Sequence, residues 1–264
     1  MSIVSTLYKF SRSQVQNRLQ LEVDRGEFEP TYLISTFPKC GSTYLMFLLL
    51  EVLGARRVSL IYDDYREQDL DYGNLLFWKN ERTLSKHHTL ATSPNIELLN
   101  KFQIRPIIIT RKLDGVLFSL RRHILRTEDW PHFAIPDDFG NWSFEKQIDC
   151  LIHLVIPWYI HFYVSWSEYL KNQPHRAFIT SYEEMVRDQE SMLSDILKFL
   201  DFEINENSLK KAIQRINSRP KHELNMYSDG RLKEEEILNN QQRDLILKMT
   251  SFYPSIEFDS IIFD

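Results

Sequence analysis

The chain has 264 residues, enough to bury one sizeable core without disulfide bonds or a structural metal. Its formal net charge of −5 argues against a general affinity for nucleic acid or for an anionic membrane surface. The longest apolar run, residues 44–50, is far shorter than a membrane span, and the amino terminus lacks the apolar segment of a signal peptide. Two cysteines suit a reducing compartment, and we expect a single soluble, cytoplasmic domain over residues 1–264.

Three short runs of β-branched and aromatic residues predict buried strands, at 31–37, 106–110 and 177–181. Apolar residues at helical spacing predict helices over about 42–53, 115–126, 144–171, 189–200, 206–217 and 235–251. Two further segments, 60–82 and 127–145, have no clear period and are expected to be ordered loops or lids. Because buried strands alternate with helices, the fold class should be α/β, with a central parallel sheet flanked by helices on both faces.

The strongest chemical signal is the loop that follows the first predicted strand, Pro38-Lys39-Cys40-Gly41, with Ser42-Thr43 opening the next helix. Free backbone amides and the helix dipole make such a junction an anion site, and a glycine lets the backbone approach a phosphate closely. The loop is not a Walker A motif, because its lysine precedes its only glycine. Taken alone, it is equally compatible with a plain turn that carries a surface lysine.

This segment resembles the PKSGTTWL loop of sulfotransferases that use 3′-phosphoadenosine 5′-phosphosulfate (PAPS), a family with a P-loop-like fold. The corresponding positions hold Lys39, Cys40, Gly41, Ser42, Thr43 and Tyr44. The resemblance implies that the loop binds the 5′-phosphosulfate end of PAPS. It further implies that Lys39 contacts the bridging oxygen and that Tyr44 helps to hold the adenine.

Two later segments resemble the same family. Arg111 directly follows the second predicted strand and Ser119 comes eight residues later, as in the family's 3′-phosphate signature. Tyr182 follows the third strand, and the family's tyrosine at this position lies near the adenine. The alternatives are a solvated basic helix face for the residues around Ser119 and a core role for Tyr182.

The general base is sought in Ser85-Lys86-His87-His88-Thr89, where cytosolic members of the family have Lys-Thr-His. Aligning the two lysines places His88 on the catalytic histidine, and a neutral imidazole suits proton abstraction near pH 7. A solvated turn or His87 as the base are the other interpretations of this segment. Because some glycan-acting relatives use glutamate, Glu67 and Glu81 also stay open.

The carboxyl-terminal part departs from the family. Gly230 could correspond to the glycine of the Arg-Lys-Gly clamp on the 3′-phosphate, but Ser228-Asp229 replaces the basic pair. Arg231 or Lys233 would then have to make the phosphate contact. The substitution therefore leaves open whether donor binding is tight.

The resemblance as a whole implies an enzyme that moves a sulfuryl group from PAPS to the hydroxyl of a small alcohol, phenol or sugar and leaves 3′-phosphoadenosine 5′-phosphate (PAP). No metal ligand set is evident, and the reaction requires none. The alternatives are a catalytically degenerate nucleotide-binding protein of the same fold or a P-loop kinase of small molecules. The oligomeric state and the acceptor stay open, although aromatic residues of the two loops suit a ring or sugar face: Tyr62, Tyr65, Tyr72, Phe77, Trp78, Trp130, Phe133 and Trp142.

Overall fold

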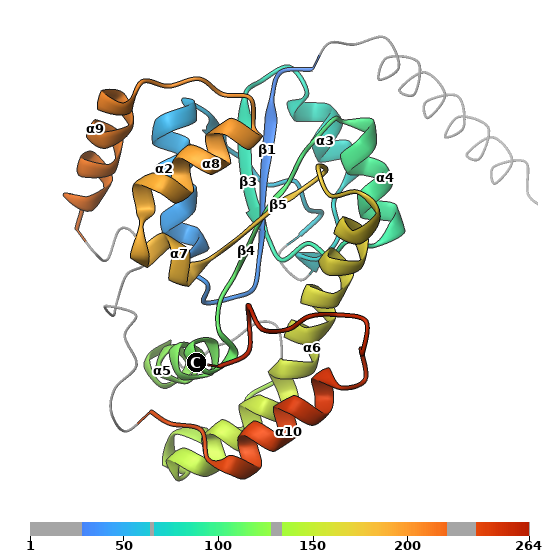
Figure 1. The fold of residues 1–264 in the computed structure, drawn as a ribbon, viewed down its shortest axis with the longest axis vertical. Coiled ribbons are helices and arrows are strands. Elements are labelled where there is room, and N and C mark those ends of the chain that lie inside the picture. The colour runs from blue at the N-terminus through green and yellow to red at the C-terminus, as the bar shows by residue number, and fades with distance from the viewer. Residues whose placement is uncertain (1–27, 64–65, 128–133, 221–235, 264) are drawn as a thin grey trace, which may run out of the picture.

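The computed structural model describes residues 28–63, 66–127, 134–220 and 236–263 (Figure 1). Its centre is a five-stranded sheet in the order β2-β3-β1-β4-β5, in which every pairing is parallel. The strands are β1 (Thr31–Thr36), β2 (Arg56–Arg57), β3 (Thr83–His87), β4 (Ile107–Thr110) and β5 (Phe178–Ser181). The strands expected from sequence are therefore present as β1, β4 and β5.

Strand β3 was not expected from the sequence, and its composition explains why. Its residues are mostly polar, yet Thr83, Ser85 and His87 are buried. Nearby polar groups satisfy them: the Ser85 hydroxyl donates to the carbonyl of Val58 at 2.9 Å, and Nε2 of His87 accepts from Leu60 N. The interpretation of residues 85–89 as a solvated turn is wrong. Residues 85–87 are the last three of strand β3, which pairs with β1, and residues 88–89 follow its carboxyl end.

Helices cover both faces of the sheet, which confirms the expected fold class (Figure 1). Helices α2, α7, α8 and α9 lie on one side, α3 and α4 lie on the other, and α5, α6 and α10 gather near the carboxyl ends of the strands. Their bounds are α2 Ser42–Leu53, α3 Tyr72–Trp78, α4 Ser93–Lys101, α5 Leu113–Thr127, α6 Phe144–Asn172, α7 Tyr182–Arg187, α8 Gln189–Phe199, α9 Glu206–Asn217 and α10 Asn240–Thr250. The segment 60–82, expected to be a loop, thus contains α3, and the last helix is shorter than expected.

Helix α6 has the length and apolar composition that would let it cross a membrane, and half of its apolar window is buried inside the protein. Its buried face includes Ile152, Tyr159 and Trp166, which belong to the same core as the strands. The indole of Trp166 donates to the carbonyl of Thr89 at 3.0 Å. This packing is that of a core helix, and it fixes α6 beside the carboxyl ends of β1 and β3.

Candidate functional site

The β1–α2 loop has the backbone geometry of an anion site. Lys39 has φ = +69° and Gly41 has φ = +77°, so the chain turns sharply before α2 begins at Ser42. The first helical hydrogen bond runs from Tyr44 N to Gly41 O at 3.0 Å. The amides that precede this bond have no place in the helical ladder, and the positive end of the helix dipole favours an anion there.

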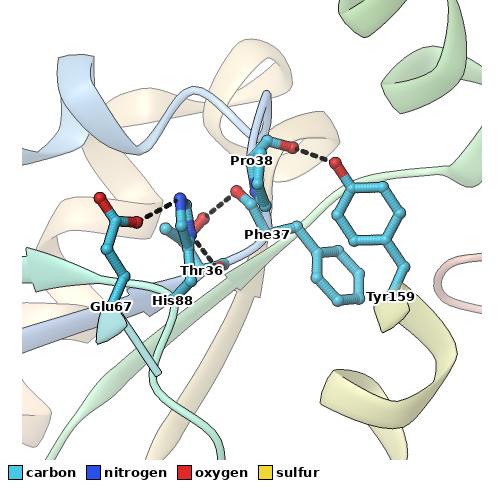
Figure 2. Close-up of polar contacts among 6 residues, drawn as sticks. All are labelled: Thr36, Phe37, Pro38, Glu67, His88 and Tyr159. Atoms are coloured by element: carbon cyan, nitrogen blue, oxygen red, sulfur yellow. Dashed lines mark hydrogen bonds and ion pairs between the residues drawn. The ribbon is translucent and has the colours of Figure 1, made fainter. Parts of the chain in front are cut away.

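Two aromatic residues hold the base of this loop (Figure 2). The ring of Phe37 packs edge-on against Tyr159, with centroids 4.4 Å apart, and the Tyr159 hydroxyl donates to Pro38 O at 3.0 Å. Cys40 is fully buried, and burial raises the pKa of its thiol far above the usual range. Its side chain is therefore an unreactive part of the core.

Arg111 lies where the loop, β4 and β5 meet. It follows β4 directly, its Nη1 donates to Lys39 O at 3.1 Å, and its guanidinium lies 3.9 Å from the ring centroid of Tyr182. Tyr182 is the first residue of α7, whose start is fixed by a capping box between Ser181 and Glu184. Lys39, Arg111 and Tyr182, which the sequence singled out separately, thus form one cluster. Ser119 is half-buried and lies about two turns along α5.

Positive charges converge on Lys39. Burial lowers the pKa of its ammonium group to about 8, and the neighbouring charges that lower it further are those of Arg126, Arg111, Lys86 and Arg122. His123 lies in the same field: burial, Lys39 and Arg126 together lower the pKa of its imidazole to about 4. A cluster of like charges around a loop of free amides is suited to a ligand with several negative charges.

His88 follows β3 and has both ring nitrogens engaged (Figure 2). Nδ1 lies 2.8 Å from Thr36 O and Nε2 lies 3.1 Å from a carboxylate oxygen of Glu67. Because a carbonyl oxygen only accepts, Nδ1 carries a proton in this contact. The ring also packs edge-on against Trp158, with centroids 5.8 Å apart.

The other two candidate bases lie elsewhere. Nε2 of His87 accepts from Leu60 N at 3.2 Å and contacts the Ser85 hydroxyl at 2.5 Å. Burial, with Lys86 and Arg57 nearby, lowers the pKa of His87 to about 3, so this imidazole is neutral. Glu81 pairs with Arg56 at 3.0 Å on the surface, just before the amino end of β3, away from the loop.

The hydroxyl of Tyr44 is held by residues of α8 and α9. Its hydroxyl accepts from Gln189 Nε2 at 2.6 Å and donates to Asn217 Oδ1. Burial raises the pKa of this hydroxyl. Sequence reasoning missed Gln189 and Asn217 as partners of Tyr44, because they come from distant parts of the chain. On the same helix, Ser42 is buried and Thr43 is half-buried.

The candidate clamp residues Gly230 and Arg231 lie outside the described residues, as do Ser228, Asp229 and Lys233. Glu236 is the first described residue after this segment, and it forms an ion pair with Arg122 on α5. The Glu236 side chain is only 3% exposed. Arg122 stands one helical turn beyond Ser119, a spacing that could have drawn attention to it in the sequence.

The aromatic residues expected around an acceptor are dispersed. The Trp78 ring lies 4.6 Å below the Arg56 guanidinium, near the amino end of β3 and thus at the opposite end of the sheet from His88. Trp142 packs under Lys146, while Tyr62 and Phe77 are exposed. Tyr65, Trp130 and Phe133 lie outside the described residues.

The model of the sulfotransferase domain family matches residues 29–252. Among solved structures, mouse sulfotransferase SULT7A1 complexed with PAP superposes with a TM-score of 0.64, at 15% identity over 87% of this chain and 87% of that one. Retinol dehydratase in a complex with retinol and PAP gives 0.55, at 12% identity over 92% and 85%. Sulfotransferase STF9 from Mycobacterium avium gives 0.53, at 13% identity over 93% and 81%.

At these identities the structural likeness shows the fold. None of the curated proteins matches the sequence significantly. The family match covers most of the chain and includes the loop, Arg111 and Tyr182. The chain therefore belongs to the sulfotransferase domain family.

Proposed function

We propose that the protein transfers a sulfuryl group from PAPS to an acceptor hydroxyl and releases PAP. The observation that carries the proposal is that the cluster of Lys39, Arg111 and Tyr182 and the His88–Glu67 pair both lie at the carboxyl ends of adjacent parallel strands. Ligands of open α/β sheets bind at this edge. Membership of the family and the PAP complexes of similar folds support the same conclusion.

The residues around the loop fit a donor with phosphates at both ends. We infer that the amides before Tyr44, with the side chains of Ser42 and Thr43, hold the 5′-phosphosulfate. Arg111 and Ser119 would hold the 3′-phosphate, with Tyr182 and Tyr44 on the adenine side. The convergence of cations that lowers the pKa of Lys39 supports this, because a polyanionic donor would relieve their mutual repulsion.

The chemistry asks little of the protein beyond positioning and charge stabilisation. The acceptor oxygen attacks sulfur in line, and the bond between sulfur and the bridging oxygen breaks. The electron pair stays on that oxygen, whose new charge the Lys39 ammonium would stabilise. The hydroxyl proton passes to the His88–Glu67 pair, a contribution of about 10²–10⁴-fold.

We propose that the acceptor is a small alcohol, a phenol or a sugar. Retinol dehydratase structures contain retinol or androsterone, and both molecules carry a hydroxyl. We propose further that residues 1–264 act as one domain in the cytoplasm on a small-molecule or glycan acceptor. Neither a nucleic-acid partner nor a membrane span is part of the proposal.

The replaced clamp favours a second candidate, a nucleotide-binding protein that has lost transfer activity. A turnover assay separates the two. The protein is incubated with PAPS and a panel of phenols, primary alcohols and amino sugars, and PAP release is measured by chromatography. Acceptor-dependent PAP release that disappears in Lys39→Ala supports the transferase. A protein that binds PAP but releases none from PAPS, with any acceptor or with water, favours the second candidate.

A further inference from the structure

His123 and Arg126 form a pair one turn apart near the end of α5. Nη2 of Arg126 lies 3.1 Å from Nδ1 of His123. Because a guanidinium only donates, Nδ1 is the acceptor in this contact and carries no proton. The pKa of His123 is lowered to about 4, so the ring is neutral near pH 7 and its proton lies on Nε2. Beyond their mutual contact, the two side chains have only N–H donors to offer, and such donors bind anions.

The same two side chains belong to the electrostatic cluster around Lys39. Among the neighbouring charges that lower the pKa of Lys39, that of Arg126 has the largest effect, ahead of Arg111. Lys39 and Arg126 in turn lower the pKa of His123. Since the interaction between charges weakens with distance, the Arg126 guanidinium lies near the Lys39 ammonium. Helix α5 accordingly lies beyond the carboxyl ends of the strands, at the edge of the sheet that holds the β1–α2 loop (Figure 1).

The donor, bound as proposed, leaves this pair without a ligand. Its 3′-phosphate is assigned to Arg111 and Ser119. Ser119 and Arg126 are seven residues apart on α5, which is about 10.5 Å along the helix axis, a gap that one phosphate does not span. Its 5′-phosphosulfate is assigned to the loop amides with Ser42 and Thr43. A second anion therefore has a place beside His123 and Arg126.

The acceptor is the molecule that enters this part of the site. In-line transfer places the acceptor oxygen about 3–3.5 Å from sulfur, opposite the bridging oxygen. Lys39 contacts that bridging oxygen in the proposed reaction, so the acceptor binds within the positive field that Lys39 and Arg126 share. A neutral acceptor would leave the repulsion between these two cations in place, whereas a negatively charged one would relieve it.

We propose that His123 and Arg126 bind a negatively charged group of the acceptor, so that the substrate is an anionic hydroxyl compound such as a hydroxy acid. The inference rests on the proposed function. Arg126 would make a charge-assisted hydrogen bond to the anionic group, and Nε2 of His123 would donate a second. The anionic group takes no part in the transfer itself and only sets which hydroxyl compound is accepted.

Three variants and a control test the two side chains. Arg126→Gln keeps a hydrogen-bonding amide and removes the charge, Arg126→Glu reverses the charge, and His123→Phe keeps a ring without its donor. Arg126 is exposed, so its variants should fold. Arg121→Gln is the matched control, because it makes the same charge change on the same helix. The Arg121 side chain is instead bound to α6, where its Nε donates to Gln147 Oε1 at 2.6 Å.

The acceptors are matched pairs of a carboxylate and its neutral amide. They are built on a phenol (4-hydroxyphenylacetate), a primary alcohol (4-(hydroxymethyl)benzoate) and a sugar (glucuronate), and tyramine is added as a cationic phenol. Each protein is first titrated with PAP by calorimetry, and its melting temperature is recorded. Binding of each acceptor to the PAP complex is then measured by calorimetry, and kcat/KM is measured with PAPS.

We expect the wild type to prefer the carboxylate over the amide by at least about tenfold on at least one of these scaffolds. Arg126→Gln should lose about ten- to a hundredfold for that carboxylate alone, with the amide and PAP unaffected. His123→Phe should lose about two- to tenfold. Arg126→Glu should favour tyramine over 4-hydroxyphenylacetate, and Arg121→Gln should behave as the wild type.

A wild type that prefers no carboxylate over its amide, or an Arg126→Gln protein with an unchanged preference, overturns the inference. An equal loss of PAP affinity in Arg126→Gln also overturns it, because the pair would then serve the donor. Selective binding of a carboxylate to a PAP complex that never turns over would support the inference and favour the protein without transfer activity. If the wild type binds no PAP, it is the proposed function that fails, and the inference fails with it.

Discussion

The ammonium group of Lys39 holds its proton less firmly than an ordinary lysine. Burial and the nearby cations lower its pKa to about 8, and the charged form is the one that can stabilise a leaving phosphate. The free protein therefore loses this charge as the pH rises through about 8. We predict that kcat/KM for PAPS falls above that pH, because this parameter reports the free enzyme.

Lys39→Arg tests the assignment, since a guanidinium stays charged throughout the accessible range. Its activity will be lower at every pH because the geometry differs, but its basic limb should disappear. A basic limb that stays at the same pH in Lys39→Arg would assign the titration to another group. The measurement is a set of initial rates between about pH 6 and pH 10, on both sides of the Lys39 pKa of about 8, with PAPS well below KM.

The residues best anticipated from sequence are those in short, contiguous motifs. Lys39, Arg111 and Tyr182 each follow a strand closely, and parallel strands bring such positions together at one edge of the sheet. The contact of Glu67 with His88 could not be derived in this way. It depends on the fold of segment 60–82, whose sequence has no period and whose path is set by tertiary packing.

At the scale of elements, the β1–α2 loop depends on Gly41. A Cβ on this residue would lie 2.6 Å from Met185 Cε and 2.9 Å from Tyr182 Cδ2, in addition to the strain of φ = +77°. Gly41→Ala should destabilise the protein by at least about 2 kcal/mol and displace Tyr182 from Arg111. Chemical denaturation and a PAP titration measure the two effects.

Gly54 is the matched control for this prediction. It ends α2 at φ = +59°, and a Cβ on this residue would have no other atom within 4 Å. Gly54→Ala should therefore cost only about 1 kcal/mol of backbone strain and leave PAP affinity unchanged. Equal losses of PAP affinity in the two variants would mean that the loop contacts of Gly41 do not matter.

The Arg122–Glu236 pair ties α5 to the chain that resumes at residue 236. The Glu236 side chain is 3% exposed and that of Arg122 is 19% exposed. Removing one partner leaves a buried charge, so Arg122→Leu should lower the free energy of unfolding by about 3–5 kcal/mol. The double variant Arg122→Leu/Glu236→Leu should regain most of this loss, whereas additive losses in urea denaturation would rule out a buried pair.

Strand β3 shows the limit of pattern reading at this scale. Alternating apolar residues or apolar runs marked β1, β4 and β5, but β3 buries a hydroxyl and an imidazole that local partners satisfy. The same polar residues that make this strand hard to recognise in the sequence directly precede His88. Helices α6, α8 and α9 were predictable almost to the residue because their apolar stripes are long and regular.

At the scale of the whole molecule, stability should fall in mild acid. The folded state holds His87 neutral with a pKa of about 3, while in the unfolded chain it titrates near about 6.5. Between these values the unfolded state binds more protons, so the free energy of unfolding rises with pH and is lost as the pH falls from about 6.5. This one group contributes a slope of up to about 1.4 kcal/mol per pH unit.

His87→Gln keeps an acceptor for Leu60 N but does not titrate. The variant is expected to show a flatter dependence of the unfolding free energy on pH, whatever its stability at neutral pH. Urea denaturation of both proteins at about pH 4.5, 5.5 and 7, below and above the ordinary histidine pKa, measures the slopes. Parallel curves for the two proteins would show that His87 is not the titrating group.

The central claim is that the carboxyl edge of the sheet binds a nucleotide with both a 3′- and a 5′-phosphate. The most direct test is a calorimetric titration with PAP and with ATP of the wild type and Arg111→Ala, with Arg105→Ala as the control at an exposed ion pair. We predict micromolar binding of PAP, weak binding of ATP and a loss of at least about tenfold for Arg111→Ala alone. A folded wild-type protein that does not bind PAP would contradict the claim.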